Sequence, residues 1–279
     1  MSTATQTWAL VRDTFRESFA RKIFWGFLGC STALILVFLL ALHIDLVEGA
    51  MAAVSIFGQS VDRGRLVEVD TVVRKLLGGV AAFLFSAGLF LSVFAAAGLI
   101  PTVFEPGRIE LLLSKPVTRT RLLLGRYLGT LAVIAANMAY LVLGVWIVLG
   151  AKTGVWHWRF LLSAVLTVFC FAVMLTIVLL VAVLSSSPAL ATMVAFFFLI
   201  ISPVLAQHAK LAPLFNAQWP RDVVKTLYYL FPKVYDMGNL ARLALIERSV
   251  GSWMPLWSSA AFAAVTLAAG LWVFSRKDY

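Results

Sequence analysis

Charged residues are scarce in this chain of 279 residues. They make up 13% of it, whereas hydrophobic residues make up 62% and the mean hydropathy is +0.95. A soluble globular domain carries about 25% charged residues, so the composition excludes that class and predicts an integral membrane protein. The net charge is nevertheless +10. Because the basic residues fall between apolar runs, they favour anionic lipid headgroups or a protein partner over nucleic acid.

Cysteines, catalytic motifs and metal-ligand clusters are equally sparse. The two cysteines, Cys30 and Cys170, lie inside apolar runs, so neither a disulfide framework nor a thiolate metal site is expected. The three histidines are far apart, and no H-x-x-x-H pair occurs. The chain lacks G-x-x-x-x-G-K-[ST] and G-x-S-x-G, so it has no P-loop and no common serine-hydrolase elbow. We therefore expect no cofactor in this chain, and an integral membrane enzyme stays only as an alternative.

Six apolar runs are long enough to cross a bilayer, since about 20 helical residues span about 30 Å of hydrocarbon. The runs are 23–42, 76–100, 128–149, 160–184, 189–205 and 256–274. They predict an all-α integral membrane protein with six transmembrane helices in a single domain, 1–279, and with both termini on one side. Lys and Arg are almost equally divided between the two sides, so charge alone does not fix the orientation.

Two of the polar segments are predicted to form helices at the membrane surface. Residues 1–22 are amphipathic and carry basic side chains. In the long segment 206–255, "DVVKTLYYLF" places apolar residues at helical spacing before Pro232, and "MGNLARLALIERS" follows as a second amphipathic stretch. In the segment 45–75, "AVSIFGQSVDRGRLVEVD" predicts a short β-hairpin around an Asp-Arg-Gly turn.

Ionisable residues are nearly missing from the predicted spans, although proton-coupled pumps and ion channels usually carry some. Asn137 is the main polar exception, and Tyr140 lies one helical turn further on. Asn137 is expected to hydrogen-bond across a helix interface, and contact with a substrate in a translocation path is the alternative. Hydroxyls such as that of Ser86 are expected to bond their own helix backbone.

The basic segment 104–129 contains a pattern of its own. Ile109, Leu112 and Leu113 fall on one face of a helix, and Pro116 ends that helix because proline removes a backbone hydrogen bond. Glu110, Leu111 and Lys115 lie outside the apolar stripe. The spacing predicts a short surface helix with a membrane side and a partner side.

A plain basic loop is the alternative for this segment. Arg119, Arg121 and Arg126 would then serve only as lipid-headgroup anchors, which explains the charge but not the stripe. Gly125 and Gly129 form a G-x-x-x-G pattern, a weak signal for close helix packing.

The stretch "FEPGRIELLLSKPVTRTRLLLGRYLG" resembles the signature of ABC-2 type permeases, the family that contains sodium-export and copper-maturation permeases. The matching residues are Glu105, Gly107, Glu110, Leu111, Leu112, Leu113, Ser114, Lys115, Pro116, Arg119, Gly125, Tyr127 and Gly129. Arg108 stands where the family usually has a small hydroxyl residue, and Thr118 where serine is common. "LSSSPALA", "YYLFPKVYDMG" and "FSRKDY" extend the resemblance along the chain.

The resemblance implies the permease subunit of an ABC transporter, and an exporter, in the cytoplasmic membrane. It implies cytoplasmic termini, an extracytoplasmic segment 206–255, a second permease copy, and two separate ATP-binding subunits that hold ATP and Mg. The helix 104–116 would be the coupling helix that docks on those subunits. Its expected contact residues are Glu105, Gly107, Arg108, Glu110, Leu111, Leu112, Ser114, Lys115 and Pro116.

One alternative remains open within the family. The permease could transmit force to an extracytoplasmic accessory protein through 45–75 and 206–255 instead of carrying a solute. The identity of any substrate does not follow from these residues.

Overall fold

The computed structural model describes residues 3–20, 22–47, 50–56, 59–60, 67–96, 99–100, 118–211, 218–246 and 252–277. The helices are α1 (Thr3–Ala20), α2 (Lys22–Ala41), α3 (Val69–Ala96), α5 (Arg119–Thr153), the 3-10 helix η2 (Trp158–Phe160), α6 (Leu161–Ser185), α7 (Pro188–Ala206), α8 (His208–Leu211), α9 (Gln218–Leu230), α10 (Val234–Ile246) and α11 (Met254–Arg276). The strands are β1 (Leu42–Val47), β2 (Ala50–Ile56), β3 (Gln59–Ser60) and β4 (Val67–Glu68).

The predicted membrane spans are present as helices. Within the described residues, α3, α5, α6, α7 and α11 are long and apolar enough to cross a membrane, and the pair Trp8–Ala20 and Phe24–Leu40, bent by 71°, supplies a sixth span if it is counted as one. The bend separates α1 from α2 as the sequence predicted. Two spans begin earlier than expected, α3 at Val69 and α5 at Arg119, because helical hydrogen bonding continues into polar residues beyond the apolar run.

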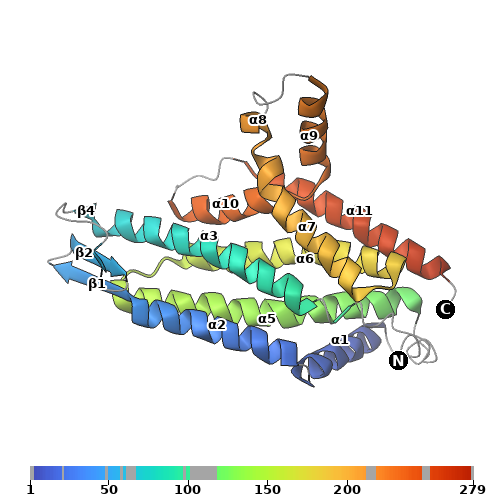
Figure 1. Ribbon diagram of the computed structural model, residues 1–279. Coiled ribbons are helices and arrows are strands. Elements are labelled where there is room, and N and C mark those ends of the chain that lie inside the picture. Colours follow the sequence, from blue (N-terminus) through green and yellow to red (C-terminus); the bar gives the residue numbers. More distant parts are fainter. Residues whose placement is uncertain are drawn as a thin grey trace.

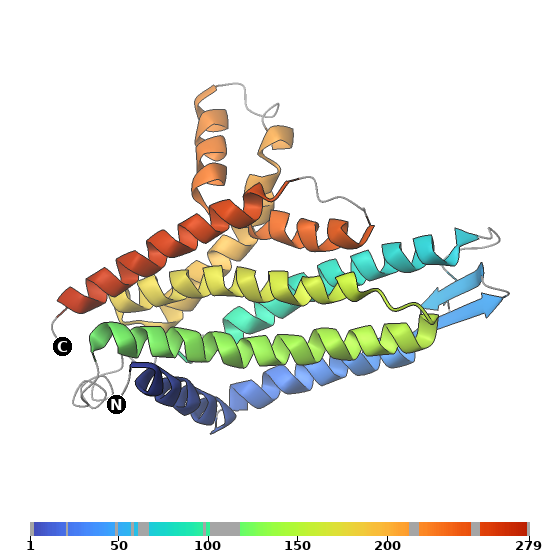
Figure 2. The same ribbon diagram turned by 180° about the vertical axis from the view of Figure 1, so that it is seen from behind.

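Both chain termini lie at one end of the bundle, here called the proximal end, together with the start of α5 and the end of α11 (Figures 1 and 2). The opposite end, here called the distal end, carries the strands and the turn between α5 and α6 (Figure 1). Helix α6 is central: it contacts α3, α5, α7, α10 and α11. Its apolar residues run around the whole helix, as expected of a helix surrounded by others, and Phe171, Met174 and Leu175 are fully buried.

The distal end carries a small antiparallel sheet. Strand β2 pairs with β1, β3 and β4. The prediction of strands in 45–75 is confirmed, although the sheet has four strands where one hairpin was expected. The fold is therefore helical with a small sheet, and the predicted Asp-Arg-Gly turn at 62–64 lies outside the described residues.

The described residues between the last two spans form three helices, α8, α9 and α10, that are placed differently. Helix α9 ends at Leu230, before Pro232, as predicted, and with α8 it projects away from the bundle (Figures 1 and 2). Helix α10 instead packs along α3 and also contacts α6 and α7. It buries Met237, Ala241 and Leu245, so the second amphipathic stretch packs its apolar face against the bundle, and its position relative to the membrane surface stays a prediction.

Candidate functional site

The predicted coupling helix falls in a part of the chain that is not described. Its nine expected contact residues, Glu105, Gly107, Arg108, Glu110, Leu111, Leu112, Ser114, Lys115 and Pro116, all lie in 101–117, outside the described residues. The structure does define what this segment joins. It follows α3 and the buried residues Leu99 and Ile100, and it leads through the extended Thr118 into α5.

Two glycines at the start of α5 are covered directly by α1. A Cβ atom built on Gly129 would lie 2.6 Å from the Cβ of Thr14, and one built on Gly125 would lie 2.7 Å from the Cβ of Leu10. No real Cβ tolerates such a distance, so only glycine permits this approach of the two helices. The close packing predicted from G-x-x-x-G is confirmed, and the structure identifies α1 as the partner.

A buried arginine pairs with two carboxylates at the same crossing. Arg126 is only 2% exposed; its Nη1 donates to Glu17 Oε2 at 2.5 Å and its Nη2 to Asp13 Oδ2 at 3.3 Å. Charge-assisted bonds from a buried guanidinium are strong and geometrically specific. Arg126 therefore fastens α1 to α5, and the alternative that it only anchors lipid headgroups is wrong.

The start of α5 is also tied to two other helices. Arg119 Nη1 donates to the backbone carbonyl of Lys277, and Lys277 Nζ donates to the carbonyl of Val183 at the end of α6, at 2.8 Å. The hydroxyl of Tyr127 donates to the carbonyl of Ala172 at 3.1 Å. We call the contacts of Leu10, Asp13, Thr14 and Glu17 with Gly125, Arg126 and Gly129 the proximal clamp. The proximal clamp joins α1 to α5, and the bonds of Arg119, Tyr127 and Lys277 join α5, α6 and α11. All four helices are therefore connected where the segment 101–117 ends.

We expect Gly129→Leu to weaken the proximal clamp. The added side chain must displace Thr14, and overpacking of this kind costs about 1–3 kcal/mol. The thermal unfolding midpoint of the purified chain in detergent should fall by a few degrees. Gly29→Leu is the matched control, because a Cβ on Gly29 has no neighbour within 4 Å. Equal midpoints for the two variants would contradict the close approach of α1.

The two other predicted site residues, Asn137 and Tyr140, lie outside the proximal clamp and differ in burial. Asn137 is buried, and its Oδ1 has no hydrogen-bond partner within the described residues. Tyr140 is 43% exposed, and its hydroxyl lies 3.1 Å from Thr32 Oγ1 of α2. Tyr140 thus joins α5 to α2. The role of Asn137 at a helix interface or in a translocation path stays a prediction.

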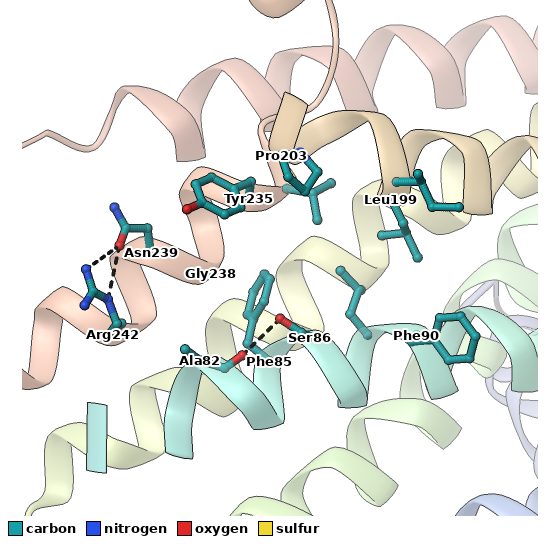
Figure 3. A pocket seen from close by; sticks show the side chains of 13 residues that line it. Ala82, Phe85, Ser86, Phe90, Leu199, Pro203, Tyr235, Gly238, Asn239 and Arg242 are labelled. Atoms are coloured by element: carbon teal, nitrogen blue, oxygen red, sulfur yellow. Dashed lines mark hydrogen bonds between the residues drawn. The ribbon is translucent and has the colours of Figure 1, made fainter. Parts of the chain in front are cut away.

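A cavity of about 500 Å³ lies between α3, α7 and α10 (Figure 3). Its lining comprises Ala82, Phe85, Ser86, Leu89, Phe90, Leu199, Ile200, Pro203, Val234, Tyr235, Gly238, Asn239 and Arg242. A volume of this size is typical of small-molecule sites, which measure about 300–1,000 Å³. Gly238 brings α10 close to α3, because a Cβ there would lie 2.9 Å from the Phe85 ring.

Helix α10 is positioned by hydroxyls from neighbouring helices. Ser202 Oγ of α7 accepts a bond from the Tyr235 amide at 3.0 Å, and Ser259 Oγ of α11 accepts one from the Lys233 amide at 3.1 Å. First-turn amides of a helix have no partner inside the helix, so these two bonds fix the start of α10 against α7 and α11. They therefore hold one wall of the cavity in place.

Lys233 brings a buried cation to the same junction. It is 2% exposed, and its Nζ lies 4.8 Å from the centre of the Tyr228 ring, with no hydrogen-bond partner within the described residues. Burial lowers the pKa of Lys233, and the Asp236 carboxylate opposes this only in part. Asp236 itself accepts a bond from the Tyr228 hydroxyl at 2.8 Å. The burial of Lys233 thus disfavours its charged form.

We expect Lys233→Met to raise stability near neutral pH, because methionine keeps an apolar stem and removes a buried charge. The sign of the pH dependence follows from the lowered pKa. Between that pKa and 10.5, the unfolded chain binds more protons than the folded one, so the stability of the unsubstituted chain should rise with pH. Subtracting the pH profile of Lys233→Met isolates this contribution in thermal unfolding. A contribution that falls with pH over this range would contradict it.

The cavity was not predicted from the sequence, apart from one hydroxyl. Ser86 Oγ donates to the carbonyl of Ala82 at 3.0 Å, as expected for a hydroxyl that bonds its own helix. Among the other lining residues, Asn239 and Arg242 give a sequence signal for a polar site, since they are polar residues inside the amphipathic stretch that forms α10. That pattern does not indicate which helices α10 meets.

The helices define a multi-pass membrane protein, in which the proximal clamp joins α1 to the membrane span α5. Comparison of the sequence with protein families gives the class. The model of the family described as ABC-2 family transporter protein matches residues 8–279. The chain therefore belongs to the ABC-2 transporter family and is the permease subunit of an ABC transporter, a transport component of the membrane. No curated protein sequence matches the chain.

Proposed function

We propose that this permease is an exporter of the cytoplasmic membrane, driven by two copies of a separate ATP-binding subunit that dock on 104–116. Family membership supports the partner, since ABC-2 permeases generally work with an ATP-binding subunit. ATP and Mg would be bound by that subunit. In this proposal the proximal end and both termini face the cytoplasm, and 206–255 faces the other side.

The proximal clamp is the observation that carries the mechanism. The segment 101–117 leads directly into α5, and α5 is joined to α1 through Arg126 and to α11 through Arg119. Movement of the docked segment would therefore displace several helices together rather than α5 alone. Packed and ion-paired elements transmit such displacements because they resist continuous deformation. A second permease copy would complete the translocation path for the substrate.

Co-purification of the tagged chain in mild detergent tests the proposal. The expected result is one ATP-binding subunit for each permease chain, together with ATP hydrolysis that is lost when its nucleotide site is inactivated. Purification of the folded chain in good yield with no ATP-binding subunit would overturn the proposal.

A second candidate function is supported by α9. Trp219, Val223 and Leu230 lie on one face of this helix and are exposed, and no residue of α9 is buried. A helix that stands off the bundle with a free apolar face could engage an accessory protein, through which the permease would transmit force. Recovery of an additional protein in the same purification, without solute movement in reconstituted vesicles, would favour this function over export.

A further inference from the structure

The cavity between α3, α7 and α10 is polar at one end and apolar at the other. The side chains of Tyr235, Asn239 and Arg242 gather at one end, and Phe90 and Leu199 lie at the opposite end (Figure 3). The direction of α3 shows which end of the cavity is nearer to each end of the bundle. Helix α3 starts at the distal end, so Phe90 is deeper in the bundle than Ala82. The polar end of the cavity therefore faces the distal surface, and the apolar end lies further along α3 toward the proximal end.

The polar end carries a positive charge that no described carboxylate neutralises. Arg242 is exposed, and its Nε and Nη2 donate to Asn239 Oδ1 at 3.3 and 3.1 Å. This pairing orients the guanidinium, and no bond from Nη1 to another described residue is present. Asp236, on the same helix, accepts from Tyr228. An arginine in such a position favours a phosphate or carboxylate.

The cavity is also open toward the outside of the bundle. Ser86, Phe90, Ile200 and Tyr235 line it and are exposed, whereas Phe85 and Leu89 form its buried floor. A molecule that diffuses in the bilayer can therefore enter from the side. A water-soluble anion would gain nothing from the apolar floor, and a neutral hydrocarbon would gain nothing from Arg242.

We propose that this cavity binds one anionic phospholipid, with its phosphate at Arg242 and an acyl chain along Leu89, Phe90 and Leu199. The lipid belongs to the leaflet at the distal end, which is the outer leaflet in the orientation of the proposed function. Because α10 forms one wall, the bound lipid would stabilise α10 against α3 and α7.

Native mass spectrometry of the detergent-purified chain tests the site with two lipids of matched acyl chains, phosphatidylglycerol and phosphatidylcholine. We expect the unsubstituted chain to retain one phosphatidylglycerol with about tenfold preference, which corresponds to about 1.4 kcal/mol. Arg242→Gln should abolish the preference. Lys225→Gln, which removes an exposed cation of α9 outside the cavity, should leave it unchanged.

Filling the cavity separates the lipid from other occupants. Ser86→Trp should reduce retention of both lipids, and Ser86→Ala should retain them as the unsubstituted chain does. Equal retention of the two lipids by the unsubstituted chain would overturn the proposal. So would loss of a dimeric species in Ser86→Trp with lipid retention unchanged, because the cavity would then face a second copy of the chain. The measurement needs no ATP-binding subunit, so its failure is distinct from failure of the proposed function.

Discussion

Replacing Arg126 with methionine is expected to abolish ATP-driven transport while the chain still inserts in the membrane. Arg126 is buried between α1 and α5, and its removal deletes the ion pairs that it forms with Glu17, only 16% exposed, and with Asp13. Breaking a buried pair by removing one partner costs about 3–5 kcal/mol, and the low end applies here because Asp13 is 58% exposed. Helix α1 would then detach from α5, although the bundle formed by α3, α6, α7 and α11 does not depend on this pair.

The measurement is transport and ATP hydrolysis in proteoliposomes that contain the permease and its ATP-binding subunit. We expect at least a tenfold loss of coupled turnover in Arg126→Met and a partial loss in Arg126→Lys, which keeps the charge but not the forked guanidinium that reaches both Glu17 and Asp13. Arg16→Met is the matched control, because Arg16 is exposed on α1. Full coupling in Arg126→Met would show that the proximal clamp does not transmit movement.

Leu111→Asp is expected to have an equally large effect by a different route. Leu111 lies outside the apolar stripe of the predicted coupling helix, on the side assigned to the partner. A carboxylate at an apolar contact would have to be desolvated on docking, which is strongly unfavourable without a cation. The permease should therefore insert and fold normally but lose its ATP-binding subunit on purification.

Glu110→Arg should give the same result through reversal of charge, whereas Leu111→Met should retain the subunit. The readouts are the ratio of ATP-binding subunit to permease and the turnover stimulated by the complex. A normal ratio together with full stimulated turnover in Leu111→Asp would exclude this face as the contact.

The extent to which the sequence predicts this structure depends on how local each signal is. The apolar runs locate the spans, and Pro232 locates the end of α9, because hydropathy and proline act within one segment. Gly125 and Gly129 predict close packing, but the partner α1 is more than a hundred residues away, as the separation of Arg126 from Glu17 shows. The burial of Arg126 was missed for this reason. The local sequence around an arginine near a span does not show whether the side chain contacts lipid headgroups or carboxylates.

The placement of α10 was beyond prediction for a related reason. Its amphipathic pattern shows that one face is apolar, but lipid and protein satisfy such a face equally well. In the structure, the close contact of Gly238 with Phe85 shows that this face packs on protein. Nothing near residue 238 in the sequence points to residue 85. The cavity is a consequence of this placement, so it too depends on tertiary contacts between three distant segments.

A photo-cross-linking residue at position 111 tests whether an ATP-binding subunit drives this permease through 104–116. The control position is Leu128, which is exposed on the membrane span α5. We expect the ATP-binding subunit to be cross-linked from position 111 and not from position 128. Failure to cross-link the subunit from position 111, or equal cross-linking from both positions, would contradict it.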